Sequence, residues 1–148
     1  MSDLVLTSGL SADYYEALEK LLFFNSEQSH VLVQIEQAVA EFGMPKIVND
    51  GGWLRIRLAQ LDEAQSLYIL QPVTPRPVLI GLLVYYRRSV SEMVVIHMAL
   101  DEDYLAETGQ TGDAVLVEIF QQFRDQLKRI RGVDTLGVGY TGTRWRLH

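Results

Sequence analysis

Two apolar runs stand close together in the second half of the chain, at residues 78–86 and 93–100. The first reads VLIGLLVYY and the second MVVIHMAL, with the polar turn 87–91 between them. Strands that are apolar at nearly every position are typical of the centre of a sheet, where both faces are covered. We therefore expect these runs to pair as antiparallel central strands, with other elements packed on both sides.

A long amphipathic helix and a short strand are expected after this pair. Residues 113–131 repeat apolar side chains at helical spacing, and Gly132 follows as a stop. Residues 135–138 then read as a strand, which a right-handed helical crossover would place parallel to 93–100. The apolar positions of the expected helix are Leu116, Ile119, Phe120, Phe123, Leu127 and Ile130.

The first half predicts two helices after a short strand at 4–6. Ser11 is a helix cap, and the apolar positions that follow it keep to one helical face. Asn25 with Gln28 resembles a capping box for a second helix, which ends at Gly43 and Pro45. The first helix carries Tyr14, Tyr15, Leu18, Leu21 and Leu22, and the second carries Val31, Ile35, Val39 and Phe42.

Two further strands are expected before the central pair. From Trp53 the period changes to two, because Leu54, Ile56 and Leu58 alternate with arginines, and a turn follows at 62–63. Residues 66–71 form another strand, and prolines at 72–77 interrupt the pairing. The fold class is therefore α+β (α/β), with a mixed, mostly antiparallel sheet flanked by helices.

Length and composition narrow the function. The 148 residues suit one domain, 1–148, and the absence of cysteine excludes disulfides and thiolate metal ligands. The net charge of −6 disfavours nucleic acid as a partner. The N-terminus lacks the pattern of a signal peptide and the apolar runs are shorter than a membrane span, so we expect a cytoplasmic protein with no membrane partner. We expect no metal, because a calcium loop counted from Asp101 would place Gly112 where a glutamate is needed.

The order and spacing of elements over residues 78–138 resemble the GNAT acetyltransferase superfamily. VLIGLL is similar to the family's apolar central strand with one glycine, and ALDEDY to its passage from strand to cofactor loop. A glycine-containing loop at 109–112 leads into the long helix, and LGV follows the helix and its Gly132 stop. The resemblance implies an acyl-CoA N-acyltransferase-like fold.

The resemblance also implies a site for acetyl-CoA. In the family the pantetheine arm pairs with backbone where two parallel strands splay apart, and the pyrophosphate meets the first amides of the long helix, which favour anions. Carried onto this sequence, the binding residues are Ala99, Leu100, Gly109, Gln110, Thr111, Gly112, Asp113 and Ala114.

The loop departs from the family pattern at its charged positions. Glu107 stands where the family has a basic or amide residue, and Gln110 stands where it has a glycine. Asp113 is expected to cap the helix and to occupy amides that a phosphate would otherwise take. The chain also stops ten residues after Val138, where family members usually continue through a further helix and a strand pair.

The resemblance points to Glu92 as a general base acting through water and to Tyr140 as a general acid. His97 is a second candidate base on its own chemistry. Each residue has a structural alternative: Glu92 and Tyr140 as solvated turn residues, and His97 as a hydrogen-bonded residue of the core.

Two functions remain open from the sequence. One is an N-acetyltransferase acting on a small amine or a protein N-terminus. The other is a non-catalytic binding or interaction module, a homodimer in which Trp145 anchors the C-terminal segment on a sheet edge or a second copy. An unrelated α+β domain is the third reading, and in it 135–138 need not lie parallel to 93–100.

Overall fold

The computed structural model describes residues 4–23, 42–138 and 143–147. Six strands form the main sheet in the order β1-β4-β5-β6-β7-β8. Neighbours are antiparallel except β6 and β7, which are parallel. The predicted mixed, mostly antiparallel sheet is confirmed, as are the 87–91 turn and the parallel placement of 135–138. The strands are β1 (Val5–Thr7), β4 (Gln65–Gln71), β5 (Val78–Arg87), β6 (Glu92–Leu100), β7 (Thr135–Val138) and β8 (Thr143–Arg146).

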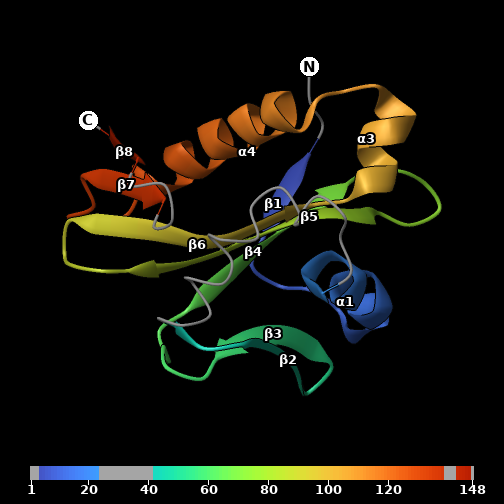
Figure 1. The fold of residues 1–148 in the computed structure, drawn as a ribbon, viewed down its shortest axis with the longest axis horizontal. Coiled ribbons are helices and arrows are strands. Elements are labelled where there is room, and N and C mark those ends of the chain that lie inside the picture. The colour runs from blue at the N-terminus through green and yellow to red at the C-terminus, as the bar shows by residue number, and fades with distance from the viewer. Residues whose placement is uncertain (1–3, 24–41, 139–142, 148) are drawn as a thin grey trace.

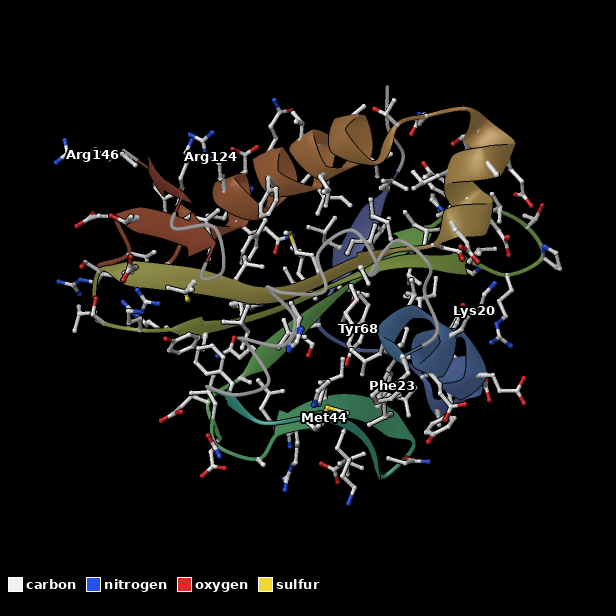
Figure 2. All side chains as sticks on the ribbon, viewed as in Figure 1. Lys20, Phe23, Met44, Tyr68, Arg124 and Arg146 are labelled. Carbon is white, nitrogen blue, oxygen red and sulfur yellow. The ribbon has the colours of Figure 1, made fainter. Side chains whose placement is uncertain are left out.

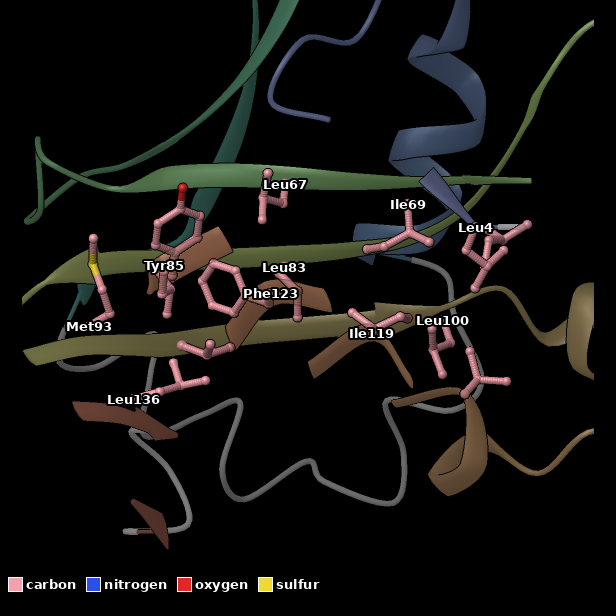
Figure 3. Packing of buried hydrophobic residues seen from close by; sticks show 14 of the residues in the cluster. Leu4, Leu67, Ile69, Leu83, Tyr85, Met93, Leu100, Ile119, Phe123 and Leu136 are labelled. Atoms are coloured by element: carbon pink, nitrogen blue, oxygen red, sulfur yellow. The ribbon is translucent and has the colours of Figure 1, made fainter. Parts of the chain in front are cut away.

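Both faces of this sheet are covered, as the apolar central strands require (Figure 1). Helix α4 (Gly112–Leu127) lies along one face, while α1 (Tyr15–Phe23) and the hairpin β2 (Pro45–Asp50) and β3 (Trp53–Leu58) lie on the other. Two clusters of buried side chains result, one on each face. In the first, Phe123 of α4 meets Tyr85 of β5 edge to face, with ring centroids 4.9 Å apart (Figure 3).

Helix α4 differs from the expected helix at both ends. It begins at Gly112 and ends at Leu127, four residues before Arg131. Ile130, expected inside, is 36% exposed, because the chain beyond Leu127 forms turns. Phe123 is fully buried as expected, but Phe120 is only partly buried at the margin of the core.

In the first half, Ser11 caps a 3-10 turn, η1 (Ala12–Tyr14), that runs into α1, and its hydroxyl accepts from the Asp13 N–H. Leu18, Leu21 and Leu22 are buried as predicted, whereas Tyr15 is exposed, which is a correction. The second expected helix falls on 24–41, outside the described residues.

Three elements were absent from the expected order: β8, β2 and a short helix. Strand β2 pairs with β3 through the turn Gly51-Gly52, whose φ angles are +63° and +94°. Such a pair of glycines is a hairpin signal in its own right. The short helix α3 (Glu102–Thr108) stands between β6 and α4, and ends at Gly109 in the left-handed conformation. Among the described helices, none combines the length and apolar character that crossing a membrane requires.

Candidate functional site

Within the described part of the chain, strand β6 has a parallel neighbour over the first part of its length. It pairs with β7 from Glu92 to Val95, and the described part of β7 ends at Val138. At the same point its register with β5 shifts, because Val84 pairs with His97 but Tyr85 pairs with Val95, so Ile96 is an extra residue. Such a bulge bends a strand and increases its twist. The edge of β6 beyond Val95, which has no parallel strand partner among the described residues, is called the β6–β7 fork, and Figure 1 shows β7 beside the first part of β6.

The residues expected to bind acetyl-CoA lie at the far end of β6 and at the start of α4. Ala99 and Leu100 are the last residues of β6, beyond the bulge, and are buried. Gly109 and Gln110 lie between α3 and α4 and are exposed. The topology therefore brings the open edge of β6 and the first turn of α4 to the same end of the sheet.

The start of α4 corrects one prediction. The cap is Thr111 and not Asp113, because the Thr111 hydroxyl accepts from the Ala114 N–H at 3.1 Å. Thr111 has extended backbone angles, which suit a cap, while Asp113 is already the second helical residue. The helix thus begins with a neutral cap, and one negative charge follows within its first turn.

Carboxylates dominate the surface where β6 ends. Asp101, Glu102 and Asp103 follow β6 directly, and Glu107 is exposed on the last turn of α3. The cation seen against them is Lys20 of α1, whose Nζ lies 2.9 Å from Asp103 Oδ2 and 3.9 Å from Asp101 Oδ1 (Figure 2). The hydrogen bond and the charge of Asp103 raise the pKa of Lys20 above its ordinary value. This end of the sheet remains acidic.

His97 lies on β6 two residues past the end of the β7 pairing. It is 8% exposed and pairs with Val84, which belongs to the cluster on the α1 and hairpin face. Burial lowers its pKa below the ordinary value, so the imidazole is neutral at neutral pH. Its Nε2 atom is buried and has no hydrogen-bond partner in the described part of the chain.

Glu92 lies at the opposite end of β6 from the acidic loop. Its carboxylate oxygen is 3.5 Å from Arg88 Nη1, across the β5–β6 turn. Glu92 and Ile96 are four positions apart, which is about 13 Å along a strand, and His97 lies one residue further on. The structure thus places Glu92 and His97 on one strand but does not bring them together. Tyr140 lies outside the described residues.

Sequence reasoning missed two parts of this site. The bulge at Ile96 has no signal in an unbroken apolar run, because both faces of β6 are buried there. Lys20 was also missed, since only the fold brings α1 beside the end of β6. Across the described ranges, no group of three or more histidine and carboxylate side chains could hold a metal ion.

No protein-family model, curated protein or solved structure matches this chain. The function of the fork is therefore inferred from its own geometry and charge.

Proposed function

We propose that the chain is a GNAT-like domain that binds acetyl-CoA at the β6–β7 fork and transfers the acetyl group to the amine of a small molecule or a protein N-terminus. Three features that lie together support this proposal: the end of the described β6–β7 pairing at Val95, the bulge at Ile96, and the start of α4 at the same end of β6. Together they make a strand edge that a linear amide-containing ligand can pair with, next to helix amides that favour an anion.

The chain's own residues have distinct parts in this proposal. The main chain of β6 beyond Val95 would hold the ligand as an added strand. The amides of Gly112 and Asp113 at the start of α4 would meet its anionic end, while Thr111 retains the Ala114 amide. His97, neutral and buried, can accept a proton from an amine. The bound acetyl-CoA supplies the activated acetyl group.

The charges at the fork set how tightly an anion binds. Glu107 and Asp113 add negative charge beside the helix start, so we expect weak binding in the unaltered chain. The double variant Glu107→Gln with Asp113→Ser should bind more tightly. A matched control, Glu63→Gln with Asp134→Ser, removes the same two charges from exposed positions elsewhere.

A thermal melt with acetyl-CoA tests this proposal. A ligand at a hundred times its dissociation constant adds about 2.7 kcal/mol of stability, which is a rise of about 5 to 10 °C for a domain of this size. We expect a small rise for the unaltered chain, a larger one for the double variant and no such gain for the control. Adenosine 3′,5′-bisphosphate, which lacks the pantetheine arm, should give no rise, because the fork is what selects the ligand. No rise with acetyl-CoA in either protein would refute binding at the fork.

The acidic surface favours a second candidate, a non-catalytic interaction module that forms a homodimer. Four carboxylates, those of Asp101, Glu102, Asp103 and Glu107, follow one another after β6, where a coenzyme with several phosphate charges would approach, and Lys20 pairs with two of them, Asp101 and Asp103. This candidate predicts no acetyl-CoA shift in any variant, and a dimer in sedimentation that Trp145→Ser weakens. Removing 144–148 is a poorer test, because Leu147 is buried in the core beside α4.

A further inference from the structure

The two sheets leave a gap between them along one edge of β3. At one end of this edge the Leu54 N–H donates to Leu10 O, and at the other the Leu61 N–H donates to Leu58 O. Both bonds lie on the side of β3 away from β2. Since main-chain groups alternate in direction along a strand, the N–H and C=O of Ile56 point the same way. Among the described residues they have no partner there.

The facing edge belongs to β4. Strand β1 covers β4 only at 68–70, because the chain turns away at Thr7, whose hydroxyl accepts from the Gly9 N–H. The edge of β4 at 65–67 is thus left without β1 and lies opposite β3. The gap between 55–57 of β3 and 65–67 of β4 is called the β3–β4 slot.

Side chains and chain crossings enclose this slot. Two adjoining pockets of about 190 and 280 Å³ lie along it and share Arg55, Ile56 and Ala64. Tyr68 of β4 lies between the main sheet and the hairpin, where its hydroxyl donates to Leu54 O at 3.2 Å (Figure 2). Tyr85 reaches the slot from the α4 side, with its hydroxyl pointing toward β4 (Figure 3).

The residues that line the slot include Arg55 and Arg57, together with Asp62. The Arg55 guanidinium lies against β2, where its Nη1 is 3.5 Å from Asp50 Oδ2, and both side chains are more than half exposed. Ion pairs so exposed are weak and can exchange for another carboxylate. The chain as a whole has a net charge of −6, so this local excess of arginine stands out.

We propose that the β3–β4 slot binds a small carboxylate ligand of amino-acid to dipeptide size. The carboxylate pairs with the Arg55 guanidinium, and an amide of the ligand pairs with the free N–H and C=O of Ile56, as an added strand residue would. Hydroxyls of Ser66 and Tyr85 on the opposite side offer further hydrogen bonds.

The closed ends of the slot set the size of the ligand. The β1-to-η1 crossing at Ser8-Gly9 limits one end and the turn at 59–64 limits the other. From Leu54 to Leu58 the β3 edge spans about 13 Å, enough for two or three extended residues. A long peptide passing through is therefore excluded, while a short one with a free carboxylate fits.

A pair of probes that differ only in the carboxylate tests the proposal. N-acetyl-alanyl-alanine and its C-terminal amide are titrated into the ¹⁵N-labelled chain, up to about 10 mM, where even ligands of millimolar affinity give large shifts. We expect saturable shifts of the Ile56 and Arg55 amide signals with the acid, and none with the amide. Equal shifts with both probes, or none with either, would overturn the proposal.

Three variants localise the effect. Arg55→Gln should weaken binding about tenfold, because it removes the charge-assisted hydrogen bonds. Asp50→Asn should tighten binding a few-fold, since it frees Arg55 from its present partner. Arg129→Gln, an exposed change of the same kind outside the slot, should leave binding unchanged. Arg55 is exposed, so its variant should melt like the unaltered chain. Unchanged affinity in Arg55→Gln would place the ligand elsewhere.

Discussion

The β6–β7 fork and the β3–β4 slot are both places where strand pairing stops, but they arise differently. The fork lies inside one sheet, where the described β6–β7 pairing ends at Val95 beside the Ile96 bulge in the pairing of β6 with β5. The slot opens between two sheets, where the chain leaves β4 at Thr7 and joins the edge of β3 at Leu10. Both have main-chain groups that can pair with an amide of a ligand. Backbone hydrogen bonding therefore does not explain why the two openings would bind different ligands.

The two openings differ in the charge of the residues around them. Carboxylates of α3 and its approach surround the end of β6 beyond the fork, whereas two arginines line the slot. A small anion is therefore favoured at the slot and disfavoured at the fork, where only helix amides and a strand edge draw it. The proposed binding of acetyl-CoA at the fork therefore depends on the geometry of the strand edge and the helix start, whereas local charge favours the proposed carboxylate ligand at the slot.

The largest effect is expected from Phe123→Ala, because this ring joins the two regions. It packs α4, which stands over the fork, against Tyr85, whose hydroxyl lies in the slot. Phe123 is fully buried, so truncation should cost about 3 to 5 kcal/mol in the free energy of unfolding. Denaturant unfolding monitored by circular dichroism measures it.

Phe120→Ala is the matched comparison on the same helix. Phe120 is only partly buried, so its loss should be clearly smaller than that of Phe123. The sequence pattern alone assigned both rings to the interior. Equal losses would mean that Phe120 is buried as deeply as Phe123.

The next effect concerns the fork alone. An added Cβ at Gly81 would lie 3.1 Å from Leu100 Cδ2 and 3.2 Å from the Ala99 carbonyl oxygen, at the end of β6. Gly81→Ala should therefore cost about 1 to 3 kcal/mol by overpacking, and should lower acetyl-CoA affinity without changing carboxylate binding at the slot. At Gly9 the added Cβ would meet Trp53 at an ordinary 3.5 Å, so Gly9→Ala is the control. A loss of slot binding in Gly81→Ala would show that the two regions are not independent.

The sequence predicted much of the main sheet and little of what opens it. Apolar runs and period-two alternation predicted β3 to β7, because burial of one or both faces of a strand produces these patterns directly in the sequence. The fork could be expected only through the family resemblance. Its bulge leaves no trace in a run where nearly every residue is apolar. The cap is Thr111 and not Asp113, and the sequence could not separate the two because both are good capping residues. The slot depends on where β1 ends and on how the β2–β3 hairpin packs against the main sheet. Both are set by tertiary packing and could not be predicted from local sequence patterns. Only the Gly51-Gly52 turn could have revealed the hairpin.

A smaller effect should appear in the pH dependence of stability. His97 has a lowered pKa in the folded chain because of burial, so the unfolded chain binds a proton more readily. Its contribution to stability is therefore full above about pH 6.5, the ordinary histidine value, and is lost as the pH falls from there toward the folded pKa. The slope for one proton is at most about 1.4 kcal/mol per pH unit.

His97→Leu isolates this contribution, because the other titrating groups remain. Urea unfolding at pH 7.5, 6.5 and 5.5 should show the unaltered chain losing more stability than the variant between the last two values. If the two proteins lost the same stability between pH 6.5 and 5.5, His97 would not be a buried neutral imidazole.

The smallest effect is expected from Lys20→Gln, and it bears on the acidic character of the fork. Lys20 is half exposed and pairs with Asp103 and Asp101, so its loss should hardly change the free energy of unfolding. The variant removes the Lys20 charge from beside Asp101 and Asp103, which should lower acetyl-CoA affinity a few-fold at low salt and less at high salt. Binding of the carboxylate probe at the slot should not change, since the slot is lined by other elements. If Lys20→Gln instead weakened both ligands equally, long-range charge and not the local surroundings of each opening would govern binding, and the contrast between fork and slot would fail.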